Sequence, residues 1–95
     1  MRHIEHHAQS QQFLYKQDAL TCVLQYHLEE QQGKPTIMAI THTGVPSPLE
    51  GQGIAADLAK AALEFARGNN WKVRPACSYI DAYMRRHHSF EPLRA

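Results

Sequence analysis

Apolar and polar residues alternate along the first half of the chain, and a period of two is typical of β-strands with one buried face. The clearest run is Leu20–Glu29, in which apolar side chains recur at Cys22, Leu24, Tyr26 and Leu28. The segments Gln11–Lys16 and Thr36–Val45 are similarly rich in aromatic or β-branched residues. The pattern therefore predicts three strands.

The connections between these strands are short. Gln17-Asp18 suits a tight turn, and the loop at residues 31–35 contains a glycine and a proline. Neither connection is long enough for a crossover, so the three strands are predicted to form an antiparallel meander.

The period changes to that of a helix after Gly53. Apolar residues now recur at helical spacing, at Ala55, Leu58, Ala59, Ala62, Leu63 and Ala66. Gly68-Asn69-Asn70 is a typical helix end. Trp71–Arg74 is predicted to be a fourth strand, parallel to the third because a helix connects them, and Ser78–His87 a second helix. The expected fold class is α/β, of the α+β kind, with helices packed on a mixed sheet.

Composition and length fit one domain. The chain has 95 residues, of which 43% are hydrophobic and 20% charged. We expect a polar N-terminal segment at residues 1–10, partly ordered, and a single domain at residues 11–95. The early histidines His3, His6 and His7 lack the cysteines or spaced partners of a metal site, so no metal is predicted.

Charge and cysteine content exclude several classes of protein. The net charge is +1, which does not favour a nucleic-acid partner held by phosphate electrostatics. No apolar run approaches the roughly 20 residues that span a bilayer, so no membrane partner is expected. The two cysteines do not form a disulfide framework, and a reducing, cytoplasmic location is the simplest interpretation.

The junction between the third strand and the first helix contains a glycine turn. Gly51 and Gly53 flank Gln52 just before the helix begins. Glycine lets the backbone approach a ligand closely, and the first amides of a helix lack intrahelical partners at the positive end of the helix dipole. The turn is therefore a candidate site for a phosphate or pyrophosphate, although glycines also serve ordinary turns.

Cys77 stands at the start of the second predicted helix, where helix amides lower the pKa of a thiol. It is either a reactive thiol or a small buried apolar residue, and its position leaves both interpretations open. Cys22 lies in the middle of a strand among apolar residues and is interpreted as core.

His42 lies near the end of the third strand. By alternation it shares a face with Met38 and Ile40, while Thr41 and Thr43 point the other way. Ligands of open α/β sheets gather at the carboxyl ends of strands, so His42, the glycine turn and Cys77 are predicted to lie together. A histidine there has a pKa suited to accepting a proton.

A small basic patch lies near the C-terminus at Arg85-Arg86-His87-His88. It is either a solvated helix end that complements the helix dipole or a contact for the phosphates of a cofactor. For Arg86 we keep the interpretation that it contacts the phosphates of a cofactor. The aromatic residues Tyr79, Tyr83 and Phe90 could line a pocket, but their spacing is more typical of a core.

In combination these features resemble the small YjdJ-type branch of the GNAT superfamily of N-acetyltransferases. The resemblance covers roughly residues 11–90. It is carried, in order, by Thr41-His42-Thr43, Val45-Pro46, Leu49, Gly51-Gln52-Gly53-Ile54-Ala55, Leu58, Ala61-Ala62-Leu63, Lys72-Val73, Pro75-Ala76-Cys77, Tyr83 and Arg85-Arg86-His87.

This resemblance implies a minimal GNAT-like fold that binds acetyl-CoA. Cys77 would lie near the acyl thioester, with His42 facing it, as the two catalytic residues. The turn would hold the pyrophosphate of coenzyme A, and the third strand would pair with the pantetheine arm. The implied cofactor-binding residues are Thr43, Gly44, Val45, Gly51, Gln52, Gly53, Ile54, Ala55, Ala56, Tyr83 and Arg86.

Glu50 departs from the superfamily pattern, in which the turn usually begins with Arg or Gln. A carboxylate directed at a pyrophosphate would be repulsive. Glu50 therefore either faces solvent or weakens the binding of coenzyme A.

The function expected from the sequence is acetyl transfer from acetyl-CoA to an acceptor, predicted to be an amine. Either His42 acts as a general base for direct attack, or Cys77 first takes the acetyl group. The alternatives are a non-catalytic module that binds coenzyme A or acyl-CoA, and more remotely a thiol hydrolase using the same two residues. The sequence does not identify the acceptor. We expect the protein to be a monomer or a weak homodimer.

Overall fold

The computed structural model describes residues 2–95. A single five-stranded sheet has the strand order β1-β2-β3-β4-β5. In chain order the elements are β1 (Glu5–His7), β2 (Gln12–Gln17), β3 (Leu20–Gln31), β4 (Lys34–Gly44), the short 3-10 helix η1 (Ser47–Leu49), α1 (Ile54–Gly68), β5 (Lys72–Pro75), α2 (Ser78–Arg86) and the 3-10 helix η2 (His88–Leu93).

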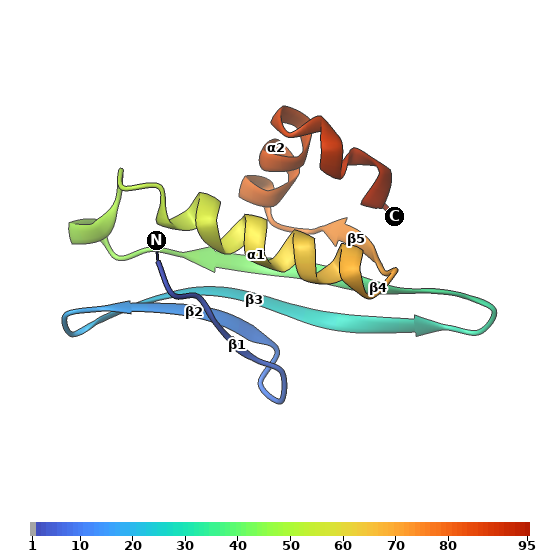
Figure 1. Ribbon diagram of the computed structural model, residues 1–95, viewed down its shortest axis with the longest axis horizontal. Helices are drawn as coiled ribbons and strands as arrows, with labels where there is room; N and C mark the ends of the chain where they lie inside the picture. Colours follow the sequence, from blue (N-terminus) through green and yellow to red (C-terminus); the bar gives the residue numbers. More distant parts are fainter. Residues whose placement is uncertain (1) are drawn as a thin grey trace.

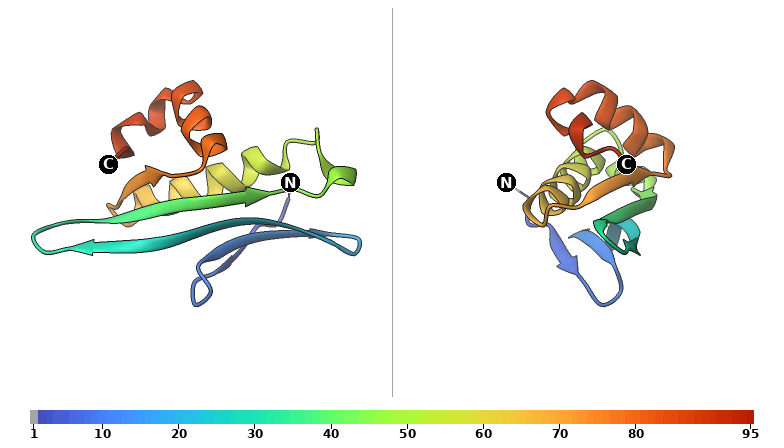
Figure 2. Two further views of the ribbon diagram at one scale, coloured as in Figure 1. Left: turned by 180° about the vertical axis from the view of Figure 1, so that it is seen from behind. Right: turned by 90° about the vertical axis from the view of Figure 1, so that its right-hand side faces the viewer.

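The sheet is mixed, as the pattern predicts. Strands β1 to β4 are antiparallel neighbours, and β5 pairs with β4 in parallel after the α1 crossover. The sequence did not predict β1, which lies in the polar segment before residue 11 and adds a fourth strand to the meander. Figures 1 and 2 show α1 lying along the sheet with α2 beyond it.

One core lies between the sheet and the two helices, and within residues 2–95 no helix covers the other face of the sheet. The fully buried side chains of the core include Leu24, Met38, Ile40, Ile54, Leu58, Leu63, Val73, Ile80 and Met84. The apolar residues predicted for the buried face of α1 are buried in this core, with one exception. The first buried residue of the helix is Ile54 and not Ala55. Ala55 is only half-buried.

A β-bulge interrupts the pairing of β3 with β4. Tyr26 pairs with Ile40 and Gln25 with His42, so Thr41 is an extra residue without a partner on β3. Because side chains alternate with a period of two, one extra residue exchanges the two faces of the strand beyond it. Thr43, opposite the buried Leu24, therefore faces the helices, and His42, opposite the exposed Gln25, faces away.

The prediction that His42 shares a face with Met38 and Ile40 is therefore wrong. It assumed regular alternation through Thr41, and the bulge breaks that alternation. The imidazole of His42 instead lies over Gly44 on the uncovered face, where a β-carbon on Gly44 would come within 3.0 Å of His42 Nε2.

The C-terminal residues fasten α2 to the sheet. The amide of Ala95 donates to the carbonyl of Val73 at 2.8 Å, and Arg94 forms ion pairs with Asp81 at 2.7 Å and Glu91 at 3.0 Å. These contacts hold the first turn of α2 beside the end of β5, where Cys77 lies.

Candidate functional site

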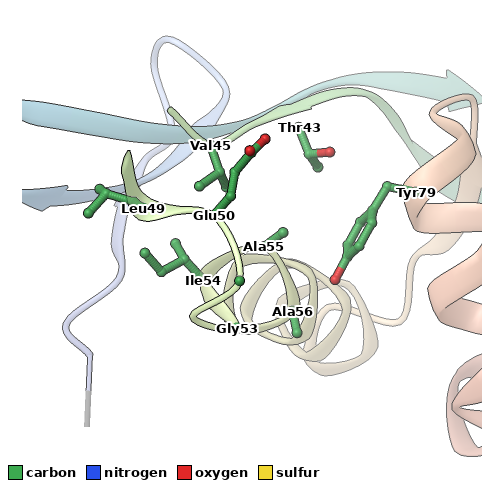
Figure 3. Close-up of a pocket in the computed structure, with 10 residues that line it drawn as sticks. Thr43, Val45, Leu49, Glu50, Gly53, Ile54, Ala55, Ala56 and Tyr79 are labelled. Atoms are coloured by element: carbon green, nitrogen blue, oxygen red, sulfur yellow. The ribbon is translucent and has the colours of Figure 1, made fainter. Parts of the chain in front are cut away.

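A pocket of about 330 Å³ opens where β4 ends and α1 begins (Figure 3). It is bounded by the end of β4, the turn after η1, the first turn of α1 and a tyrosine of α2. The lining residues are Thr43, Val45, Leu49, Glu50, Gly51, Gly53, Ile54, Ala55, Ala56 and Tyr79. Seven of the eleven residues predicted to bind the cofactor are in this set: Thr43, Val45, Gly51, Gly53, Ile54, Ala55 and Ala56.

The glycine turn forms the floor of the pocket. Gly51 and Gly53 have φ angles of +82° and +80°, which residues other than glycine rarely adopt. Gly53 is the N-cap of α1, and its carbonyl accepts the first helical hydrogen bond from the Asp57 amide at 3.1 Å. The amides before Asp57 therefore have no intrahelical acceptor and supply donors at the positive end of the helix. The arrangement suits an anion.

The edge of β4 is free beside the pocket. Its pairing with β5 ends at Ile40 and Pro75, and beyond these residues β4 remains hydrogen-bonded to β3 alone among the described strands. The main chain of Thr41–Gly44 therefore presents its second edge to the segment that carries Cys77. An extended ligand can pair with such an edge as an added strand would.

Cys77 lies next to this edge. It is the N-cap of α2 and is half-buried, and its Sγ is 3.6 Å from Thr43 Oγ1. Burial acts to raise the pKa of the thiol. Hydrogen bonding from the Thr43 hydroxyl and from the amides of Ile80, Tyr79 and Thr43 outweighs burial, so the pKa lies below its ordinary value.

Cys22 provides the internal contrast. It is fully buried in β3, and burial raises the pKa of its thiol. The prediction that Cys22 is core is confirmed, whereas Cys77 has the surroundings of a reactive thiol.

The other predicted site residues lie in different places. His42 is exposed on the uncovered face together with Gly44, opposite the face that carries Thr43. The main-chain carbonyl of Gln52 accepts a hydrogen bond from Arg2, on the side of the turn away from the pocket. Tyr83 does not line the pocket.

Tyr83 is buried, with its ring stacked on His87 at a centroid distance of 3.9 Å. Tyr79, one turn earlier on α2, lines the pocket instead, and in Figure 3 its ring extends toward the first turn of α1. Burial raises the pKa of Tyr79, and the positive charge of Arg86 partly offsets this. Arg86 itself is exposed and does not line the pocket.

Tyr79 and Glu50 are lining residues that the resemblance does not assign to the cofactor. The spacing of the aromatic residues favours a core position for Tyr79. The sequence signal for a pocket position is that Tyr79 lies only two residues after Cys77, the N-cap of α2. The Glu50 side chain extends from the turn toward β4 in Figure 3, so its carboxylate belongs to the pocket.

Two kinds of feature are not found in the described part of the chain: a metal-binding cluster and a membrane-spanning helix. Among residues 2–95 no group of three His, Cys, Asp or Glu side chains is arranged to hold a metal ion. Over the same residues no helix combines the length and apolarity required to cross a membrane.

Comparison with known proteins identifies a family, curated relatives and a structural neighbour. Residues 12–93 match the family model of GCN5-related N-acetyltransferases. Protein NATD1 of Mus musculus is 38% identical over 84 residues, which cover 86% of this chain and 73% of NATD1. NATD1 of Homo sapiens is 37% identical over 84 residues, with 86% and 71% coverage. The solution structure of a GCN5-like putative N-acetyltransferase from Staphylococcus aureus superimposes with a TM-score of 0.74 and 26% identity, covering 98% of this chain and 87% of that one.

Proposed function

The chain belongs to the GCN5-related N-acetyltransferase family, and we propose that it transfers the acetyl group of acetyl-CoA to an amine. The observation that carries this proposal is a continuous path along the pocket. The path starts at the free edge of β4 beside Cys77 and ends at the amides of the glycine turn.

The parts of coenzyme A match this path in order. The pantetheine arm carries amide groups that can pair with the main chain of Thr43–Val45, as a peptide pairs with a strand edge. The pyrophosphate would then lie against the amides of Gly53, Ile54, Ala55 and Ala56. Two left-handed glycines before α1 leave room for the phosphates at the turn. The residues present therefore fit the donor.

In the proposed reaction Cys77 is the nucleophile. Its thiolate attacks the carbonyl carbon of the thioester, a new C–S bond forms, and coenzyme A leaves as a thiolate that takes up a proton. The amine then attacks the acetyl-cysteine, loses its proton, and releases the Cys77 thiolate. The Thr43 amide, which faces the sulfur, is a donor for the oxyanion of each step.

His42 keeps its proposed role as a general base, but it acts from the face of the sheet opposite the one that the predicted alternation gave it. It lies on the uncovered face, beside the point where β4 and β5 separate. It can accept a proton from an amine that approaches the acetyl group from that face. This role applies equally to direct transfer from acetyl-CoA, in which the amine attacks the thioester without an acetyl-cysteine.

Mass spectrometry with acetyl-CoA and no acceptor tests the covalent route. We expect one acetyl group on the wild-type protein and on Cys22→Ala, mapped to Cys77, and none on Cys77→Ala. Full turnover by Cys77→Ala with an amine acceptor would exclude the acetyl-cysteine and leave direct transfer. Absence of coenzyme A binding in calorimetry would exclude the proposed function itself.

A second candidate is a module that binds coenzyme A or acyl-CoA without catalysis. The carboxylate of Glu50 in the pocket favours it, because that charge opposes the phosphates. Such a module would bind coenzyme A in calorimetry but release no free thiol from acetyl-CoA with any amine. Glu50→Gln is expected to tighten binding under either candidate, with Glu30→Gln, an exposed carboxylate outside the pocket, as the matched control.

A further inference from the structure

The N-terminal segment reaches the glycine turn through Arg2. Arg2 Nη2 donates to the carbonyl of Gln52 at 2.5 Å, and Arg2 Nη1 pairs with Asp57 Oδ2 at 2.5 Å. The guanidinium also lies over the Tyr15 ring, 5.8 Å from its centroid. One side chain thus contacts the turn, the first turn of α1 and strand β2, although it lies 50 residues away from Gln52 in sequence.

The contact of Arg2 with Gln52 restricts the orientation of the peptide between Gln52 and Gly53. In a trans peptide a carbonyl and the following N–H point in opposite directions, and the described chain contains no cis peptide. Holding the Gln52 carbonyl toward Arg2 therefore turns the Gly53 amide the other way. Arg2 borders a separate groove with Asp57 and Lys60, whereas Gly53 lines the pocket.

The contact of Arg2 with Asp57 affects the net charge beside the glycine turn. Asp57 is the acidic residue in the first turn of α1, close to the amides that would meet an anion. An unpaired carboxylate at this position would repel phosphates, as Glu50 does from the other side. The side chain of Arg2 is only 25% exposed, and its guanidinium neutralises Asp57 directly.

We propose that Arg2 is a positioning residue for the donor: it fixes the Gln52–Gly53 peptide so that the Gly53 amide faces the pocket, and it withholds the charge of Asp57 from the phosphates. This proposal rests on the proposed function, because the ligand whose phosphates it concerns is coenzyme A. It assigns the segment before β2 a role in ligand binding.

The test compares Arg2→Ala with Arg85→Ala, which removes the same charge from an exposed arginine paired with Asp81. Calorimetry measures the binding of coenzyme A and of pantetheine, which lacks the pyrophosphate. We expect Arg2→Ala to weaken coenzyme A binding about tenfold, the size of effect of a lost charge-assisted hydrogen bond. Pantetheine binding is expected to stay within about twofold of wild type in both variants.

A second readout uses the free protein. Order parameters from ¹⁵N relaxation report whether Gly51 and Gly53 are rigid. We expect them to fall in Arg2→Ala and to stay at wild-type values in Arg85→Ala. Arg2→Lys keeps the charge but lacks the fork that reaches both acceptors, so it should recover only part of the affinity and rigidity.

Unchanged coenzyme A binding in Arg2→Ala would overturn the proposal, and so would an equal loss for pantetheine. Wild-type protein that fails to bind coenzyme A would overturn the proposed function. The order parameters of Gly51 and Gly53 would then decide separately whether Arg2 fixes the turn.

Discussion

Strand β4 has two halves that differ in pairing and burial. From Ile37 to Ile40 it is hydrogen-bonded to β3 on one side and β5 on the other, and every side chain is buried. From Thr41 onward it keeps only β3 among the described strands, and its side chains are half-buried or exposed. One extra residue thus separates a half that holds the sheet together from a half whose edge is available to a ligand.

Deleting Thr41 should remove the difference between the halves, and we expect it to have a larger effect than any substitution in β4 or the turn. Without the extra residue, His42 and Thr43 keep their partners on β3 and their faces, but β4 loses the bend and extra twist of the bulge. Its edge could then continue to pair toward Cys77 and close to a ligand. We expect coenzyme A binding to be lost, as measured by calorimetry. Replacing Thr41 by Val, which keeps the bulge, is the control. Binding by the deletion variant within about twofold of wild type would show that the bulge does not matter.

Truncations in the two halves should differ in their cost to stability. Met38 is fully buried, so Met38→Ala is expected to lower the free energy of unfolding by about 2–5 kcal/mol. Thr43 is half-buried and at the free edge, so Thr43→Ala should cost about 1 kcal/mol or less. Urea denaturation measures both. Similar losses for the two variants would contradict the division of β4 into unequal halves.

Gly53→Ala tests the turn that continues the free half. At a φ of +80° an alanine is strained by roughly 1–2 kcal/mol, and the turn should shift to relieve it. We expect a lower melting temperature and coenzyme A affinity reduced by about tenfold. Gly68→Ala is the matched control, because a β-carbon there meets nothing within 4 Å and the backbone is ordinary. An unaltered affinity in Gly53→Ala would argue against a pyrophosphate site at the turn.

Thr43→Val should have the smallest effect, confined to the chemistry of Cys77. In wild-type protein the pKa of Cys77 is lowered, so alkylation by iodoacetamide should rise with pH and level off at a lower pH than for an ordinary thiol. Losing the Thr43 hydroxyl removes a hydrogen bond to the thiolate, which moves that midpoint upward. Cys22, buried and with a raised pKa, should stay unlabelled throughout. A midpoint that does not move would show that the hydroxyl has no part in the shift.

Much of the fold could be predicted because its patterns are local. The alternation in Leu20–Glu29 and the helical spacing after Gly53 predict β3 and α1 within a few residues. The antiparallel meander and the parallel step to β5 follow from the lengths of the connections, and the fold-class prediction is confirmed. The family resemblance is confirmed at the level of GCN5-related N-acetyltransferases, and its YjdJ-type branch stays a prediction.

The parts that sequence reasoning missed depend on contacts between distant residues. Nothing local distinguishes Thr41 from its neighbours, because the bulge is defined by what β3 places opposite β4. Strand β1 is too short for a period to show, and it forms only by pairing with β2. Tyr79 and Tyr83 have similar sequence surroundings. The packing of α2 places Tyr79 in the pocket and Tyr83 in the core.

In the proposed complex the turn at Gly51–Ala56 meets the pyrophosphate through its main-chain amides. An alanine scan, the usual survey of a binding site, would therefore pass over Gln52 and Ile54 with little loss attributable to ligand contact, and Ala55 and Ala56 would not be tested at all. Substitutions that alter the backbone itself, such as proline or an ester in place of an amide, are the ones that can detect this surface. For the same reason the proposed site would tolerate a change of side chain in the turn more readily than a change of backbone.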